Sequence, residues 1–345
     1  MTSFVHLIHS LDPQGGGVSE AVVRLDSEFN KCVEKSSILS NRLSVPEKYS
    51  VVLAHGLWQW PSYMAWKNYK KNGTPYLVFP HGMLDPWFKK SYPLKHIKKQ
   101  IYWWYRQGEI LRDAYAVCFT TEEERLLAQK TFSPYQCREI VTGLGVGDPP
   151  GDLEEQSALL YSQFPQLKNK RVLLYLGRFH PKKGVDLLIN AFVKYRNDDD
   201  ILVLAGPSNK QDSYLRTLQK LTAKNEKQIL WTGMLERDLK WGMLRVADAL
   251  ILPSHQENFG MVIAEALSVG TPVFLTNKVN LWREVVDFGA GIVSNDHQEG
   301  ILELVHKWSR GEHDQLVENT VLCFREKLHI SQTAENIMSL FSKNE

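Results

Sequence analysis

The 345 residues of the chain exceed what one hydrophobic core usually organises, so we expect two domains of ordinary size. Hydrophobic residues make up 43% of the chain and charged residues 23%, a balance typical of globular α/β proteins that excludes a disordered chain. The net charge of +2 is too small to indicate a nucleic-acid-binding protein, and no apolar run approaches the roughly 20 residues of a membrane span, so we expect a cytoplasmic protein, peripheral to the inner face of a membrane at most.

Residues 1–150 are expected to form the first domain, a doubly wound α/β fold. Short apolar runs alternate there with helix-like or turn segments, which is the order of a parallel sheet with crossover helices. The strand-like runs lie at 4–9, 51–54, 76–79 and 116–120, and a helical pattern covers 19–29.

Residues 151–330 continue this alternation and are expected to form the second domain. The stretch 142–165 holds the densest turn-forming residues of the chain and predicts the linker. Strands are expected at 171–176, 201–205, 228–232, 249–252 and 272–275, and helices at 184–195, 213–223, 239–246 and 261–269. The pattern favours two Rossmann-like domains that face a central cleft.

The segment 253–267 carries the most informative motif. After a strand, a polar loop carries Glu257, and an apolar helix that holds Glu265 starts around Phe259. Unpaired backbone N–H groups and the helix dipole would stabilise a phosphate at this helix N-terminus. The residues that would present these N–H groups are Asn258, Phe259 and Gly260. Two glutamates with seven residues between them also occur by chance on solvated helices, which is the alternative.

A second group of charged residues follows the first strand of the second domain. Arg178 and Lys183 lie in the loop 177–184 and would both reach a pyrophosphate if the loop folds over it. Two fixed cations would neutralise the charge that develops on a leaving nucleoside diphosphate, so no metal and no other cofactor is expected. A solvated strand-to-helix turn is the alternative.

These motifs resemble the retaining glycosyltransferases of family 4, which have the GT-B fold, and especially their bacterial polysaccharide-type members. The E-x7-E motif of that family is matched by Glu257 and Glu265, and its G-R-x4-K-G pattern by residues 177–184. The resemblance implies that Glu257 lies beside the transferred sugar and that Glu265 binds the nucleotide ribose. It also implies that Arg178 and Lys183 bind the donor diphosphate.

Three further segments share the resemblance. The glycine cluster 15–17 is similar to the first loop with which the family closes over the donor, which assigns Gly16 and Gly17 to donor binding. A flexible turn is the alternative there. Met234 resembles the turn that contacts the nucleobase, although many turns look alike. The C-terminal helix, 331–345, is expected to cross back onto the first domain.

His81 follows the strand at 76–79, at the sheet edge where ligands bind in open α/β folds. It resembles the histidine that neighbours the transferred sugar in the family. The catalytic candidates are therefore Glu257, His81, Arg178 and Lys183. A lone histidine is more often structural, and we interpret three others in that way: His6, His9 and His55.

Residues 87–106 interleave lysines with aromatic residues. The first 150 residues hold 18 Lys and Arg against 14 Asp and Glu, and the excess is concentrated in this segment. Such a surface would lie against anionic lipid headgroups, which suits a lipid-linked acceptor. The alternatives are an ordinary amphipathic helix with its aromatics in the core, or a surface for single-stranded nucleic acid, which nothing else in the chain supports.

Asp198, Asp199 and Asp200 have the D-x-D spacing of metal-dependent transferases. They precede a strand, whereas ligand loops in wound sheets follow the carboxyl ends of strands. We therefore interpret them as a surface turn and expect no metal site.

The predicted function is that of a metal-independent retaining hexosyltransferase. The donor is expected to be a nucleotide sugar, with UDP preferred over GDP, and the acceptor a glycan or a lipid-linked molecule. Retention by front-face attack is expected because the resemblance implies it and no second carboxylate is evident as a nucleophile. Two alternatives are a non-catalytic nucleotide-sugar-binding protein and an epimerase or hydrolase of the same fold.

Overall fold

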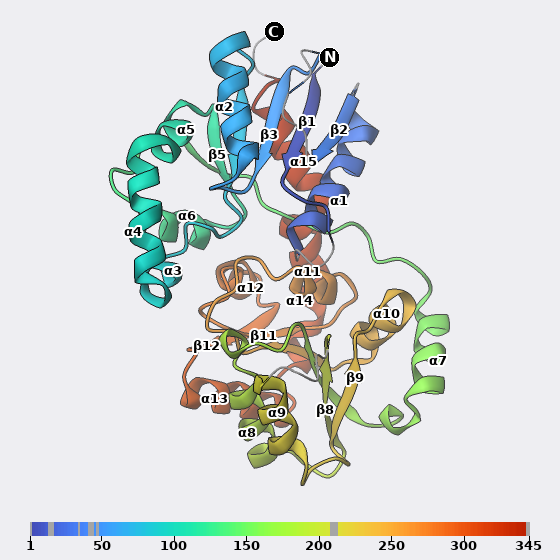
Figure 1. Cartoon of the computed structure of the whole chain (residues 1–345). Helices are drawn as coiled ribbons and strands as arrows, with labels where there is room; N and C mark the ends of the chain where they lie inside the picture. Colours follow the sequence, from blue (N-terminus) through green and yellow to red (C-terminus); the bar gives the residue numbers. More distant parts are fainter. Residues whose placement is uncertain are drawn as a thin grey trace. The chain divides into compact units, whose positions relative to one another are not determined.

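The computed structural model describes residues 2–12, 17–33, 35–40, 45, 48–207 and 213–342. The chain divides into two compact units, Met1–Gly147 with Leu328–Glu345, and Asp148–Lys327. Each unit is built on a six-stranded parallel sheet covered by helices (Figure 1). The predicted pair of doubly wound α/β folds is confirmed.

The sheet of the first unit has the order β2-β1-β3-β4-β5-β6. Its strands are β1 (Ser3–Ile8), β2 (Lys35–Ser40), β3 (Val51–His55), β4 (Tyr76–Phe79), β5 (Ala116–Phe119) and β6 (Glu139–Val141). The four central strands are buried along their whole length, because helices cover both faces of a parallel sheet.

The helices of the first unit come from both ends of the chain. They are α1 (Gly17–Cys32), α2 (Trp60–Asn72), α3 (Trp87–Ser91), α4 (Pro93–Tyr102), α5 (Gly108–Asp113), α6 (Glu122–Ala128) and α15 (Ile330–Ser339), with a π-helical turn at Trp103–Gln107. Figure 1 shows the C-terminal helix α15 beside α1 and β1. Ile330 and Ile337 of α15 join the same core cluster as Phe4 and Phe29.

Part of the stretch expected as a linker packs against the segment that leads into α15. Val146 and His329 form a parallel bridge, and the N–H of Val146 donates to the carbonyl of Leu328 at 3.0 Å. A Cβ atom on Gly145 would overlap the backbone at 328–330, so the two segments lie too close for any side chain there. The second half of the stretch is occupied by helix α7 (Leu153–Gln163).

The sheet of the second unit has the order β12-β11-β10-β7-β8-β9. Its strands are β7 (Arg171–Leu176), β8 (Asp200–Ala205), β9 (Ile229–Gly233), β10 (Ala249–Leu252), β11 (Val273–Thr276) and β12 (Gly291–Ser294). Besides α7, its helices are α8 (Val185–Tyr195), α9 (Ser213–Thr222), α10 (Arg237–Val246), α11 (Met261–Ser268), α12 (Trp282–Asp287), α13 (Gln298–Ser309) and α14 (Val317–Cys323).

Candidate active site

Both sheets have a point at which the strand order reverses. In the second unit, β7 and β10 are neighbours, and later strands run outward from them in both directions. In the first unit, the reversal lies between β1 and β3. Ligands of open α/β sheets bind outside the carboxyl ends of the strands at such a point. In the second unit, the loops that follow β7 and β10 carry Arg178, Lys183 and Glu257.

The β7–α8 loop packs closely on the β10–α11 loop. Gly184 has a φ of +63°, and a Cβ atom there would overlap the carbonyl oxygen of Pro253, so only glycine fits. The N–H of His255 donates to the carbonyl of Lys182 at 2.7 Å. These contacts hold Lys183, which ends a short 3-10 turn, next to the glutamate loop.

Glu257 is fixed through its backbone. Its N–H donates to the carbonyl of Lys278 at 3.0 Å, and its carbonyl accepts from the N–H of Asn280 at 3.0 Å. The backbone of Glu257 thus bridges to the segment after β11, in parallel with Val279. The backbone that carries its carboxylate is therefore held between two loops at the same edge of the sheet.

Helix α11 begins at Met261, later than the predicted start near Phe259. The reason is Gly260, whose left-handed backbone, φ +73° and ψ 73°, cannot belong to a right-handed helix. Phe259 is buried and anchors the turn. The side-chain oxygen of Asn258 accepts from the amide of Asn280 at 3.3 Å. The first turn of the helix is thus formed by the residues that follow Gly260, and phosphate binding by the N–H groups of 258–260 stays a prediction.

Lys183 and Glu257 form an ion pair, with side chains 11% and 21% exposed. Burial, helped by the charges of Lys182 and Arg178, lowers the pKa of Lys183 to about 7. The carboxylate of Glu257 acts in the opposite direction. Lys183 is thus a partly desolvated amine whose positive charge is favoured by an anion beside it.

Glu265 already has a cationic partner. Nζ of Lys240, on α10, lies 2.7 Å from one carboxylate oxygen and 2.6 Å from the other. The side chain of Glu265 is only 2% exposed. A ribose hydroxyl would have to share these oxygens with the ammonium group, so ribose binding by Glu265 stays a prediction.

The remaining donor-site candidates are more exposed. Arg178 is exposed, and its backbone carbonyl accepts from the hydroxyl of Tyr175 at 2.7 Å. Met234 follows β9 directly and is 64% exposed. Gly17 is the first residue of α1, whereas Gly16 lies outside the described residues. Their roles in donor binding stay predictions.

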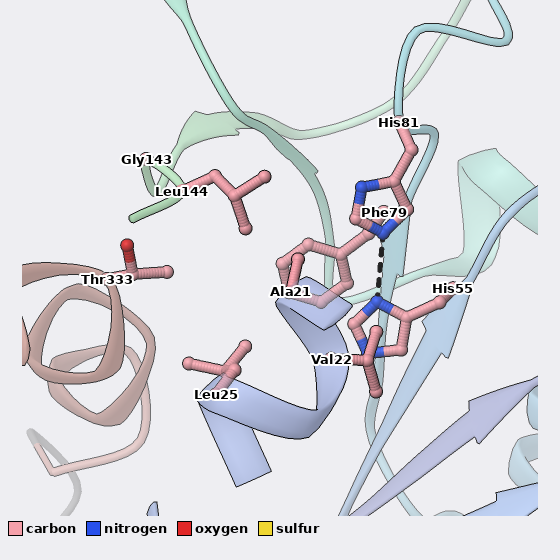
Figure 2. A pocket seen from close by; sticks show the side chains of 9 residues that line it. All are labelled: Ala21, Val22, Leu25, His55, Phe79, His81, Gly143, Leu144 and Thr333. Atoms are coloured by element: carbon pink, nitrogen blue, oxygen red, sulfur yellow. Dashed lines mark hydrogen bonds between the residues drawn. The ribbon is translucent and has the colours of Figure 1, made fainter. Parts of the chain in front are cut away.

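His81 lines a pocket in the first unit (Figure 2). The other lining residues are Ala21, Val22, Leu25, His55, Phe79, Gly143, Leu144 and Thr333. Nε2 of His81 lies 3.0 Å from Nδ1 of His55, and Nε2 of His55 lies 2.9 Å from Nδ1 of His6. Of the histidines interpreted as structural, His55 therefore contacts the catalytic candidate His81 directly and His6 reaches it through His55, whereas His9 is exposed.

Glu124 supports His81 and was missed in the sequence. Its buried carboxylate accepts from the N–H of Gly82 at 2.5 Å and from the N–H and hydroxyl of Thr120 at 2.8 and 2.6 Å. These bonds hold His81 in the left-handed region, with φ +50°, which is uncommon for a side chain of this size. The acidic run 122–124 gave no such signal, because it reads as the first turn of a helix.

The segment 87–106 presents apolar side chains to solvent. Within α4 and the π-helical turn, the exposed fractions are 76% for Leu94, 56% for Ile97, 58% for Ile101, 65% for Trp104 and 73% for Tyr105. Trp103, by contrast, is buried and donates to the carbonyl of Pro134 at 2.7 Å. Core packing of the aromatics therefore accounts for Trp103 but not for the two residues after it.

The interpretation of residues 198–200 as a surface turn is wrong for Asp200. This residue begins β8, is fully buried, and accepts from the guanidinium of Arg171 at 2.8 and 3.1 Å. Asp199 pairs with Lys170 at the surface. The described part of the chain contains no cluster of His, Cys, Asp or Glu side chains that could hold a metal ion. None of its helices is long and apolar enough to cross a bilayer.

Comparison with solved structures shows the fold. A glycosyltransferase from Rickettsia africae superimposes with a TM-score of 0.79 at 14% identity, covering 100% of this chain and 99% of that one. HepE from Anabaena, in complex with UDP and glucose, gives a TM-score of 0.76 at 13% identity, covering 99% and 100%. The predicted GT-B fold is confirmed.

Comparison with protein families covers both units. Residues 161–320 match the family of glycosyl transferases group 1, and residues 35–140 match the glycosyl transferase 4-like domain. The glycogen synthase of Mycobacterium tuberculosis is 33% identical over 122 residues, which are 35% of this chain and 29% of that protein. The chain spans about a third of the length of the curated relatives it matches. By its fold and both family matches, the chain belongs to the group 1, family 4-like glycosyltransferases of the GT-B class.

Proposed function

We propose that the protein transfers a sugar from a nucleotide-sugar donor to a hydroxyl group of a glycan or lipid-linked acceptor, with retention of the anomeric configuration and without a metal ion. The observation that carries this proposal is the position of Lys183, Arg178 and Glu257 beside the strand-order reversal of the second unit. Two cations and one carboxylate are what a sugar diphosphate needs: cations for the phosphates and an acceptor for the sugar hydroxyls.

The ion pair between Lys183 and Glu257 describes the site before the donor binds. A donor diphosphate brings an anion that replaces Glu257 as the partner of Lys183. The carboxylate of Glu257 is then released to accept hydrogen bonds from sugar hydroxyls. The exchange keeps the partly buried lysine charged throughout, which avoids the cost of an uncompensated ammonium group.

Transfer breaks the bond between the anomeric carbon and the oxygen of the β-phosphate, and forms a bond from the same carbon to the acceptor oxygen on the same face. The acceptor proton passes to the departing phosphate oxygen. Negative charge grows on the diphosphate, and Lys183, Arg178 and the N–H groups at the start of α11 stabilise it there. With two cations in place, no step requires a divalent metal.

UDP is the preferred nucleotide of the proposed donor. This preference is supported by HepE, a protein of the same fold whose structures contain UDP, glucose and UDP-glucose. A thermal-shift panel of UDP, GDP, ADP and their sugars tests it, since a ligand that binds the native state raises the melting temperature. The proposal requires the largest shift with a uridine nucleotide, and a larger shift with GDP would refute the preference.

A lipid-linked acceptor is supported by the exposed face of α4. Leu94, Ile97 and Ile101 recur at helical spacing, and Trp104 continues the same stripe. Exposed lysines accompany it: Lys89, Lys90, Lys95 and Lys98. Apolar and aromatic side chains enter the lipid interface while lysines attract anionic headgroups, so this face would hold the enzyme at an anionic bilayer.

Vesicle co-sedimentation tests the membrane contact. The protein should sediment with phosphatidylglycerol vesicles and less with phosphatidylcholine vesicles, and the double substitution Leu94→Asp with Ile101→Asp should abolish sedimentation. Leu159→Asp is the matched control, since Leu159 is an exposed leucine of α7 in the other unit. Equal sedimentation of the double variant and the wild type would overturn this part of the proposal.

Product analysis separates transfer from the alternatives. An epimerase or hydrolase would convert the sugar nucleotide without an acceptor, and a binding protein would leave it intact. We expect an acceptor-dependent glycoside with the anomeric configuration of the donor. Lys183→Ala and Arg178→Ala should each lower turnover by about 100-fold or more with the fold intact. Lys194→Ala, which removes an exposed lysine from α8, is the control that should retain activity.

A further inference from the structure

We propose that Asp26, His6 and His55 hold His81 in a single tautomer, whose Nδ1 carries no proton and accepts a hydrogen bond from a substrate hydroxyl. The inference deepens the proposed function, on which it rests for the identity of that hydroxyl as a sugar hydroxyl. His81 would contact the substrate, whereas the other three are positioning residues that act through it.

The three imidazoles form a chain of hydrogen bonds. The rings of His6 and His55 are nearly parallel, at 9°, with centroids 5.2 Å apart and facing nitrogens 2.9 Å apart. His55 and His81 repeat this geometry at 22°, 5.3 Å and 3.0 Å. Because the nitrogens are much closer than the centroids, the rings meet edge to edge, as in-plane hydrogen bonds require.

Each ring in the chain carries one proton. Burial lowers the pKa of His6 to about 3 and that of His81 to about 4, and it lowers the pKa of His55 as well. A neutral imidazole has one N–H donor and one acceptor nitrogen. The chain therefore has only two consistent states, in which all the donors point one way or all point the other way.

Asp26 selects between these two states. Nε2 of His6 is buried, has no hydrogen-bond partner among the described residues, and lies 4.0 Å from Oδ1 of Asp26. This oxygen also accepts from the hydroxyl of Ser36 at 2.6 Å, which fixes the carboxylate. An N–H on Nε2 of His6 is attracted to the carboxylate, whereas a lone pair there is repelled by it.

The direction of the chain follows from that choice. With its proton on Nε2, His6 accepts at Nδ1 from Nε2–H of His55. His55 in turn accepts at Nδ1 from Nε2–H of His81. Nδ1 of His81 is then the free acceptor at the end of the chain. Figure 2 shows this second ring nitrogen on the side of His81 that faces Leu144 and the pocket.

The backbone of His81 is fixed independently of its ring. The left-handed turn at His81 is held by the bond from the N–H of Gly82 to the buried carboxylate of Glu124. The ring and the backbone at His81 are thus constrained by different residues, His55 and Glu124. A nitrogen held this rigidly accepts a hydrogen bond from a hydroxyl group in one direction, which favours one orientation of the substrate.

Nitrogen-15 spectra of the full chain labelled at histidine test the tautomers directly. Long-range proton–nitrogen correlations distinguish a protonated from an unprotonated ring nitrogen. We expect Nε2–H and bare Nδ1 on His6, His55 and His81 at neutral pH, with assignments made from His6→Phe and His81→Gln. A proton on Nδ1 of His81 would overturn the inference.

Asp26→Asn tests the positioning role, with His9→Asn as the control because His9 is exposed in the same unit. Asp26→Asn should add a second set of histidine signals with Nδ1–H and lower kcat/KM about tenfold, while the control changes neither. A variant that keeps the wild-type spectrum and rate refutes the role of Asp26. If the wild type transfers sugar but His81 has the opposite tautomer, this inference alone is refuted. If His81 has the expected tautomer but the wild type transfers sugar from no donor, the proposed function alone is refuted.

Discussion

Acidification should destabilise the first unit through its buried histidines. In the unfolded chain a histidine has its ordinary pKa of 6.5, so it is protonated at pH 5. In the native state His6 and His81, with pKa values of about 3 and about 4, stay neutral at that pH. The unfolded state therefore binds more protons than the native state, and stability falls as the pH drops below 6.5.

The size of this destabilisation follows from the difference between pH 5 and the pKa of 6.5 that a histidine has in the unfolded chain. Each of these two histidines lowers the free energy of unfolding by about 2 kcal/mol at pH 5 relative to neutral pH, since each pH unit below the unfolded-state pKa is worth about 1.4 kcal/mol. Together they remove about 4 kcal/mol, and His55 acts in the same direction. Because the whole stability of a domain is about 5–15 kcal/mol, this loss is a large part of it.

Urea denaturation at pH 7.5 and pH 5 measures the effect if unfolding is followed by pulsed hydrogen exchange at one common pH. Mass spectrometry of the peptides that contain β1 and β3 then reports on the first unit alone. His6→Phe should lose about 2 kcal/mol less than the wild type between the two pH values. His9→Asn should behave as the wild type. An identical pH dependence in His6→Phe and the wild type would refute the reasoning.

Three further substitutions test the packing around the sites. Gly184→Ala should destabilise the second unit by at least about 1–2 kcal/mol, because its φ of +63° is unfavourable with a side chain and the Cβ atom meets the Pro253 carbonyl; a thermal melt would show no shift if this packing were wrong. Arg171→Met should cost about 3 kcal/mol in urea denaturation, because it leaves the fully buried Asp200 without its cation, and a loss below about 1 kcal/mol would contradict the burial of that pair. Glu124→Ala should lower transfer activity even at temperatures at which the variant is still folded, since it releases the turn at His81. An unchanged rate would show that this turn does not contribute to the reaction.

The central strands were predictable because they are apolar and buried along their length. Those at 51–54, 76–79, 171–176 and 249–252 were expected within a residue of where they lie. The edge strands β2, β6 and β12 were not predicted. They are mostly half-buried, so the hydrophobic pattern that marks a strand is weak there.

The residues proposed for the donor site stand out in the sequence as motifs, but the contacts that they make do not. The contact between Lys183 and Glu257 depends on β7 and β10 being neighbours, and strand order in a sheet leaves no trace in local sequence. Lys240 was missed and Asp200 was misinterpreted as part of a surface turn for the same reason, since their partners, Glu265 and Arg171, lie on other elements of the fold.

The histidine chain shows the limit of local patterns most clearly. His6 and His55 occupy strands β1 and β3, and only the parallel pairing of these strands sets their rings side by side. Taken singly, each histidine is most simply explained as a core residue. Their connection to His81 follows from the sheet topology.

The affinities of UDP and uridine test most directly whether Lys183 belongs to a diphosphate site. We predict by calorimetric titration that the wild type binds UDP far more tightly than uridine, and that Lys183→Ala weakens UDP by roughly 30-fold while leaving uridine unchanged, which corresponds to about 2 kcal/mol for a charge-assisted phosphate contact. Equal affinities of the wild type and Lys183→Ala for UDP would contradict the account.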